Sequence, residues 1–167
     1  LVRSRGLGDV YKRQTFMNPQ ITVEEEITLV SLHNIPAEMA VIAEIFEKIA
    51  LMDIDVDIIS LSPVQGAQTS LSFTIRDESL IRLLEYTKSL EGGKAKAIVS
   101  GGNYIISVLD EGMAQKPGVA AKLFRAVSAV NPDIRIISTS EVQISLLVTN
   151  ADFEKTLDAV ERCVKAL

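Results

Sequence analysis

Few residues of this chain have side chains suited to catalysis, and they are scattered. The 167 residues include one histidine, His33, and one cysteine, Cys163. No second histidine, cysteine or acidic cluster stands at a catalytic or metal-ligand spacing from either. His33 is expected to be an ordinary loop residue, and Cys163, beside the apolar stripe of the last helix, a packing residue. We therefore expect no catalytic residue, no metal site and no internal disulfide.

Two glycine pairs, Gly92-Gly93 and Gly101-Gly102, are the other candidates for a functional loop. Neither lies between a strand and a helix start in the Gly-x-Gly-x-x-Gly frame that cradles phosphates. Both pairs are expected to be turns. No nucleotide cofactor is therefore expected to bind this chain.

A site for a free amino acid fits the residue types better. The ligand carboxylate needs hydrogen-bond donors, which the free N–H groups at a helix start supply, and the ammonium group needs an acid or carbonyl on the next strand. In the first half of the chain we expect these groups to be the backbone of Ala40, Val41 and Ile42, with Asp55 and Asp57 nearby. The alternative, that both acids face solvent on an edge strand, stays open.

The second half offers an equivalent helix start and a polar hairpin turn. Short polar residues also satisfy the backbone of their own turn, so a purely structural role for the hairpin is the alternative. The candidates are Gly118, Val119 and Ala120 at the helix start and Ser138, Thr139, Ser140 and Glu141 in the turn.

Apolar periodicity predicts alternating strands and helices. Apolar residues make up 47% of the chain and aromatic residues 5%, so the cores are expected to consist of Ile, Leu, Val and Ala. Asp77 is expected to cap the second helix. Strands are expected at 27–32, 54–59, 70–75, 95–99, 104–109 and in the hairpin 134–148, and helices at 41–49, 80–87, 117–130 and from about Asp152.

The same order of elements occurs twice, which indicates an internal repeat. Adding 78 carries Val41 to Val119, Phe46 to Phe124 and Ile59 to Ile137. The repeat predicts an α+β fold of two sandwiches in tandem, with mostly antiparallel sheets and helices on one face.

Charge and hydropathy exclude two classes of partner. The net charge is −5, and no Lys/Arg cluster follows residue 14, so nucleic acid is not expected as a partner. No apolar run approaches the roughly 20 residues of a membrane span, so no membrane association and a cytoplasmic location are expected. Residues 1–14 are basic and lack any period, which indicates a tail that is not native sequence.

The run Ile-Ser-Thr-Ser-Glu at 137–141, preceded by Lys-Pro-Gly-Val-Ala-Ala-Lys-Leu-Phe at 116–124, resembles the C-terminal regulatory part of aspartate kinases. The resemblance covers about 24–167 and implies two ferredoxin-like βαββαβ modules, called ACT domains, at 24–99 and 100–167. In that family an N-terminal strand completes the second module. Here residues 15–23 contain Pro19 and form at best an edge strand, in which only Phe16 and Met17 are suited to that crossover.

The resemblance also implies a function. Such a region binds an end-product amino acid, lysine or threonine, and controls the ATP-dependent phosphorylation of L-aspartate in the lysine, threonine and methionine pathway. The implied partners are an aspartate kinase catalytic domain or subunit and a second copy of the chain, paired through ACT domains. ATP and Mg would belong to the kinase domain, whose Lys-Phe-Gly-Gly-Thr start is absent here, so the chain alone is not expected to be an enzyme.

The resemblance adds four pocket residues: Ile35, Glu38, Val56 and Ser62. The family usually has Pro-Gly where the first half has Met39-Ala40, whereas the second half keeps Pro117-Gly118, so the first site is expected to be altered or lost. For the 137–141 turn, pairing of ACT units is preferred over ligand contact. The alternative function is an amino-acid-sensing module of another biosynthetic enzyme or of a transcription regulator.

Overall fold

The computed structural model describes residues 19–91 and 95–167. The expected non-native tail, Phe16, Met17 and the Gly92-Gly93 pair lie outside these residues. The described chain forms one six-stranded sheet in the order β2-β3-β1-β4-β6-β5, and every neighbouring pair is antiparallel. The predicted α+β class with antiparallel strands is confirmed.

Four helices pack on this sheet. The strands are β1 (Gln20–Pro36), β2 (Ile59–Leu61), β3 (Gln68–Arg76), β4 (Lys96–Leu109), β5 (Ile134–Thr139) and β6 (Gln143–Val148). The helices are α1 (Met39–Leu51), α2 (Leu80–Glu91), α3 (Val119–Ser128) and α4 (Phe153–Val164). In the parts of the chain that the structure describes, no helix is long and apolar enough to cross a membrane.

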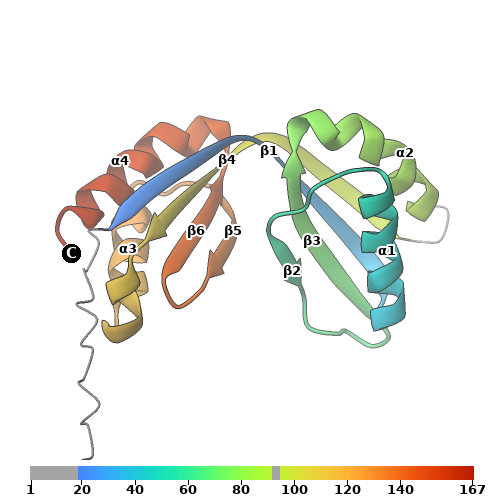
Figure 1. The fold of residues 1–167 in the computed structure, drawn as a ribbon, viewed down its shortest axis with the longest axis horizontal. Helices are drawn as coiled ribbons and strands as arrows, with labels where there is room; N and C mark the ends of the chain where they lie inside the picture. Colours follow the sequence, from blue (N-terminus) through green and yellow to red (C-terminus); the bar gives the residue numbers. More distant parts are fainter. Residues whose placement is uncertain (1–18, 92–94) are drawn as a thin grey trace, which may run out of the picture.

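The sheet curls into an arch whose two ends carry the helices. Helices α1 and α2 cover one end and α3 and α4 the other, while β1 and β4 run through both (Figure 1). We call the α1/α2 end the first half and the α3/α4 end the second half. The division of the chain into two units at 99/100 stays a prediction.

The first strand shows how the halves are joined. Residues 20–24 pair with residues 105–109 of β4, at the edge of the second half, while residues 27–36 pair with β3 in the first half. Residues 20–24 make this crossover and continue without a break into the first predicted strand. Pro19 precedes the strand, so its missing N–H costs no ladder hydrogen bond.

The second glycine pair was wrongly predicted to be a turn. Gly101 and Gly102 lie inside β4, which is one continuous strand where two were expected. Gly102 has φ +69°, a conformation that glycine adopts without steric cost, and so allows an irregular strand to continue.

Two other local predictions need correction. The strand predicted at 54–59 is instead the shorter β2 (Ile59–Leu61). Residues 54–58 belong to no strand, although Asp57 and Ile58 hydrogen-bond to Thr74 of β3. Asp77 lies in a short 3₁₀ turn (Asp77–Ser79) and makes no cap bond to the helix. Its carboxylate accepts hydrogen bonds from Thr28 and from the backbone of Gly102 instead.

Each half has its own core on the helix side of the sheet. In the first half Phe73 is fully buried, and its ring meets Phe46 edge-on at 5.6 Å between centroids. In the second half Leu146, Leu123 and Val160 are buried between β6, α3 and α4. Phe124, which the repeat pairs with Phe46, is exposed, so the two cores are not copies of one another.

A third cluster lies on the helix-free face. Ile27, Leu29, Ile105 and Leu147 are buried there, and Ile58 and Ile136 pack against them from the two outer parts of the sheet. These residues come from both halves. The inner side of the arch is therefore held by apolar contacts between the halves.

Asp152, at the start of α4, links the second half's helix layer to its sheet. Its carboxylate accepts from the backbone N–H of Asp133 at 2.8 Å and pairs with Lys155 Nζ at 2.5 Å. The hydrogen bonds from Lys155 and Asp133 hold the pKa of the Asp152 carboxyl below its ordinary value. A depressed folded-state pKa stabilises the fold above the unfolded-state pKa, and this contribution is lost as pH falls through the folded-state value.

Asp152→Asn is therefore expected to flatten the acid side of the stability profile. Urea midpoints measured between neutral pH and about pH 3, below the ordinary pKa of an aspartate, should fall less steeply in the variant than in the unmodified chain. Asp158→Asn, an exposed acid on the same helix, is the matched control. An unchanged slope in Asp152→Asn would contradict the assignment.

Candidate functional site

The second half brings most of its predicted site residues together in one cavity. This cavity has a volume of about 530 Å³ and lies between the start of α3 and the β5–β6 hairpin. We call it the α3 cavity. Six predicted residues line it, together with Met113, Ala114, Lys116 and Ile144: Gly118, Val119, Ala120, Thr139, Ser140 and Glu141.

The helix start offers backbone donors to this cavity. Gly118 has φ +93°, and its carbonyl accepts the first α-helical bond, from Lys122 N at 3.0 Å. The N–H groups of Val119 and Ala120 precede that bond and have no intrahelical acceptor. No atom lies within 4 Å of where a Cβ on Gly118 would be, so a ligand can approach the backbone closely. Such a helix start favours a carboxylate.

The hairpin turn partly serves its own backbone. Ser140 N donates to Gln143 O at 2.8 Å, and Val142 N donates to Ser140 Oγ at 3.4 Å. Thr139 and Glu141 are exposed on the hairpin beside the α3 start. A role in satisfying the backbone of the turn thus accounts for Ser140. The side chains of Thr139 and Glu141 remain accessible to a ligand.

The first half does not assemble its predicted helix-start site. Val41 N and Ile42 N both donate to Glu38 O, at 3.0 and 3.2 Å, so neither amide is available to a ligand. Helix α1 begins at Met39, whereas at the equivalent place in the second half Pro117 and Gly118 precede the helix. The Met39-Ala40 departure therefore lets the helix start earlier and occupies the amides that Pro-Gly leaves free.

The predicted acids of the first half lie far from that helix start. Asp57 N donates to Thr74 O, while Ala37, just before α1, bonds to the loop that precedes Thr69. Thr69 and Thr74 are five positions apart on β3, roughly 17 Å along a strand. The sequence suggested that these groups form one site, and the structure places them at opposite ends of β3 within the first half.

The remaining first-half candidates fall into separate places. Ile35 and Ile42 are buried core residues. Ser62 lines a small cavity of about 170 Å³ beside Asn34. Asp55, Val56 and Asp57 line a cavity of about 270 Å³ with Glu24 and Arg76, whose charged groups lie 3.4 Å apart.

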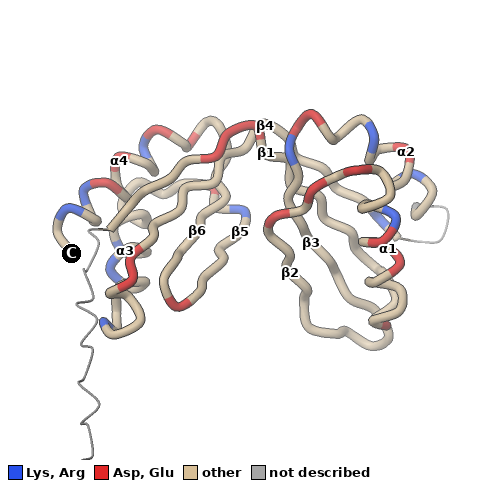
Figure 2. Tube along the Cα trace, viewed as in Figure 1, with Lys and Arg blue, Asp and Glu red and all other residues tan. Residues whose placement is uncertain are grey.

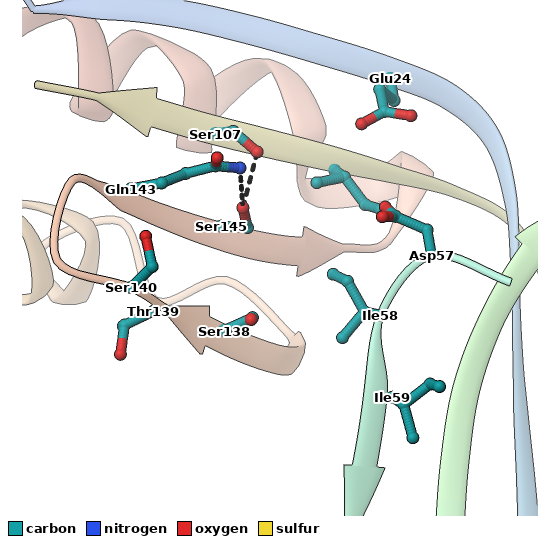
Figure 3. A pocket seen from close by; sticks show the side chains of 11 residues that line it. Glu24, Asp57, Ile58, Ile59, Ser107, Ser138, Thr139, Ser140, Gln143 and Ser145 are labelled. Carbon is teal, nitrogen blue, oxygen red and sulfur yellow. Dashed lines mark hydrogen bonds between the residues drawn. The ribbon is translucent and has the colours of Figure 1, made fainter.

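A further cavity, of about 270 Å³, lies on the inner side of the arch and joins candidates from both halves. We call it the inner cavity. Asp57, Ile58 and Ile59 face the β5–β6 hairpin across it, where Ser138, Thr139 and Ser140 lie (Figure 3). Ser107 and Ser145 share a hydrogen bond of 2.7 Å, and Gln143 donates to Ser145 at 3.0 Å.

Two acidic residues, Glu24 and Asp57, line the inner cavity. Glu24 belongs to the acidic stretch of β1 that crosses the top of the arch, and Asp57 follows the acidic segment after α1 (Figure 2). Lys and Arg are found mainly on the helices, with Arg76 at the end of β3 and Arg135 on β5 (Figure 2). The inner cavity thus combines carboxylates from one side with hydroxyl groups from the other.

Comparison with known proteins identifies the type of domain. Residues 106–163 match the ACT domain family. An aspartokinase of Bacillus sp. (strain MGA3) is 30% identical over 165 residues, which covers 92% of this chain and 38% of that protein. The ligand-free regulatory subunit of aspartate kinase from Thermus thermophilus superposes with a TM-score of 0.78 at 26% identity, covering 86% of this chain and 95% of that one. Residues 106–163 therefore form an ACT domain, and over most of its length the chain is similar to the regulatory subunits of aspartate kinases.

In extent the chain corresponds to a regulatory subunit of aspartate kinase. It spans 38% and 39% of the first two aspartokinases that it matches, but nearly the whole of the Thermus regulatory subunit. Aspartokinase III of E. coli, solved in complex with lysine and aspartate, has the same fold, with a TM-score of 0.69 at 20% identity over 92% of this chain and 34% of that one. The resemblance noted in the sequence is confirmed.

The isolated histidine and cysteine have structural roles. His33 lies on β1, not in a loop as expected, and its Nδ1 is 3.0 Å from Ser70 Oγ. Cys163 is half-buried and packs on the second core. Within residues 19–91 and 95–167, no group of three or more His, Cys, Asp or Glu is placed to hold a metal ion.

Sequence reasoning missed the polar residues that the sheet itself contributes. Glu24, Ser107, Gln143 and Ser145 line the inner cavity, but they come from β1, β4 and β6, far apart in sequence. The alternation of Ser145 with the apolar Ile144 and Leu146 was the available signal. This alternation indicates which residues face away from the helix-side core, but the register between strands decides which of those residues contact one another.

Proposed function

We propose that this chain senses an end-product amino acid and reports it to an aspartate kinase catalytic domain or subunit. The observation that carries the proposal is the α3 cavity, where unoccupied helix-start amides face a hairpin acid. Binding of the amino acid there shifts the equilibrium between two arrangements of the kinase. A coupling free energy of roughly 1–3 kcal/mol is enough for useful inhibition.

The groups around the α3 cavity suit a zwitterion. The N–H groups of Val119 and Ala120, with the ammonium of Lys116, are placed to receive the α-carboxylate. The carboxylate of Glu141 and the hydroxyl of Thr139 are acceptors for the α-ammonium. Met113 and Ile144 offer an apolar surface to the rest of the ligand.

The proposed effector is lysine or threonine, as the family implies, and the E. coli aspartokinase III complex shows that a protein of this fold takes lysine. The α3 cavity itself favours threonine. Glu141 is the one acid that lines it, and Lys116 adds a positive charge. A lysine ligand brings two ammonium groups, and the second would have no carboxylate there.

The proposed assembly contains two copies of the chain paired through their ACT domains, together with the kinase part. The exposed edge strands β2 and β5 leave backbone groups available for such pairing. The pairing and the control of L-aspartate phosphorylation in the lysine, threonine and methionine pathway are both part of the proposal.

Isothermal titration of the full chain with threonine, lysine and methionine tests the effector role. Glu141→Gln is expected to weaken binding about 10-fold or more, because a hydrogen bond to a charged group contributes roughly 1.5–3 kcal/mol. Glu154→Gln, on the exposed side of α4, is the matched control and should bind as the unmodified chain does.

Asp57→Asn distinguishes binding in the α3 cavity from binding at the first-half acids. Unchanged binding in Asp57→Asn with loss of binding in Glu141→Gln supports the α3 cavity. Loss of binding in Asp57→Asn with unchanged binding in Glu141→Gln would instead move the site to one of the two cavities that Asp57 lines. No binding of any of the three amino acids by a folded chain would contradict the sensing role.

A further inference from the structure

The two strands that join the halves carry a matched pair of irregularities. Glu24 of β1 pairs with Ile105 of β4, and Leu29 pairs with Ser100, but between them Ile27 pairs with Asn103. β1 thus has one extra residue before Ile27, and β4 has one extra residue after Ser100. The two insertions cancel, so the same register holds in both halves with a bulge on each strand between them.

Both bulges contain a residue with a left-handed backbone. Glu26 of β1 has φ +59°, and Gly102 of β4 has φ +69°. Bulges bend a strand and increase its twist. They fall where β1 and β4 pass from one helix pair to the other at the top of the arch (Figure 1). The bend between the halves is therefore built into the backbone at this double bulge.

A single carboxylate closes the double bulge on the helix side of the sheet. Asp77 Oδ2 accepts from the Gly102 N–H at 3.0 Å, and Asp77 Oδ1 accepts from the fully buried Thr28 hydroxyl. Asp77 thus holds β1 and β4 together at their irregular point. Gly101 and Thr28 are closely packed at this point, since a Cβ on Gly101 would lie 3.3 Å from Thr28 Oγ1.

The opposite face of the same bend is apolar. Ile27 and Leu29 flank Thr28 and point to the inner side of the arch, where they pack with Ile105 and Leu147. Ile58 of the first half joins this cluster. The bend is held by hydrogen bonds on the helix side and by apolar contacts on the inner side.

We propose that the double bulge, closed by Asp77, is a rigid joint that fixes the angle between the two halves. Asp77 begins the turn that leads into α2. A displacement of α2 is therefore passed through the Asp77 carboxylate to Gly102, and hence along β4 into the second half. The angle also sets the separation of the inner cavity's walls, with Asp57 on one side and Ser138 on the other. This inference does not depend on which amino acid binds.

Spin labels on the two outer helices measure the angle directly. Glu47→Cys on α1 and Glu154→Cys on α4, in a Cys163→Ser background, place one label on each half of the full chain. Electron–electron double resonance should give one narrow distance distribution. Asp77→Ala should broaden and shift it, while Glu78→Ala, the exposed neighbouring acid, should leave it unchanged.

A milder pair of variants covers the case in which Asp77→Ala does not fold. Thr28→Val removes only the hydroxyl donor at constant volume and should broaden the distribution, whereas Thr28→Ser keeps the donor and should not. A distribution that is already broad in the unmodified chain would overturn the proposal. So would a narrow, unshifted distribution in folded Asp77→Ala or in folded Thr28→Val.

Discussion

Phe73→Ala is expected to lower the free energy of unfolding by about 3–5 kcal/mol, the cost of removing a large buried aromatic ring from a core. Phe73 is fully buried on β3, and its ring meets Phe46 edge-on at 5.6 Å. The substitution removes the transfer free energy of the ring, leaves a cavity and breaks the aromatic pair. Urea unfolding at neutral pH measures the loss.

Phe124→Ala is the matched control for Phe73→Ala. Phe124 keeps 37% of its surface exposed, so its truncation should cost no more than about 1 kcal/mol. The comparison tests whether the two cores differ as the structure shows. Equal losses in the two variants would contradict the exposed position of Phe124 and favour two equivalent cores.

The second large effect is expected at Asn103. This residue is 1% exposed, and its Nδ2 donates to Ile27 O at 3.0 Å and to Ser100 O at 2.7 Å. The side chain thus ties Ile27 of β1 to β4 at the irregular part of their ladder. Asn103→Ala removes both hydrogen bonds and is expected to cost about 2–4 kcal/mol, since each unsatisfied buried group costs about 1–3 kcal/mol.

Asn150→Ala provides the comparison for Asn103→Ala, because Asn150 is exposed at the start of a short 3₁₀ turn. Its expected effect is within about 0.5 kcal/mol. Thermal and urea unfolding of both variants measure the difference. A loss below about 1 kcal/mol in Asn103→Ala would show that water replaces the amide and that the carbonyls are less enclosed than the structure indicates.

The local elements and the repeat were determined by the sequence itself. Apolar spacing at 41–49 and alternation at 143–148 predicted α1 and β6, because side-chain periods of 3.6 and 2 follow from backbone geometry alone. The Pro117-Gly118 pair also distinguished the two helix starts. Glycine in the left-handed conformation at Gly118 delays α3, so the amides of Val119 and Ala120 stay open, whereas the equivalent amides of Val41 and Ile42 donate to Glu38 O.

Only the tertiary structure decided which of these groups meet. Ala40 and Asp57 looked like one site because a helix start is followed by the next strand in sequence, yet α1 carries the chain along the length of β3 between them. Gly101-Gly102 looked like a turn because two glycines usually break a strand. Pairing with β1 over both halves, the Asp77 carboxylate and the Asn103 amide keep β4 continuous there. These contacts join residues as far apart in sequence as Gln20 and Leu109, and local patterns carry no information about partners at that distance.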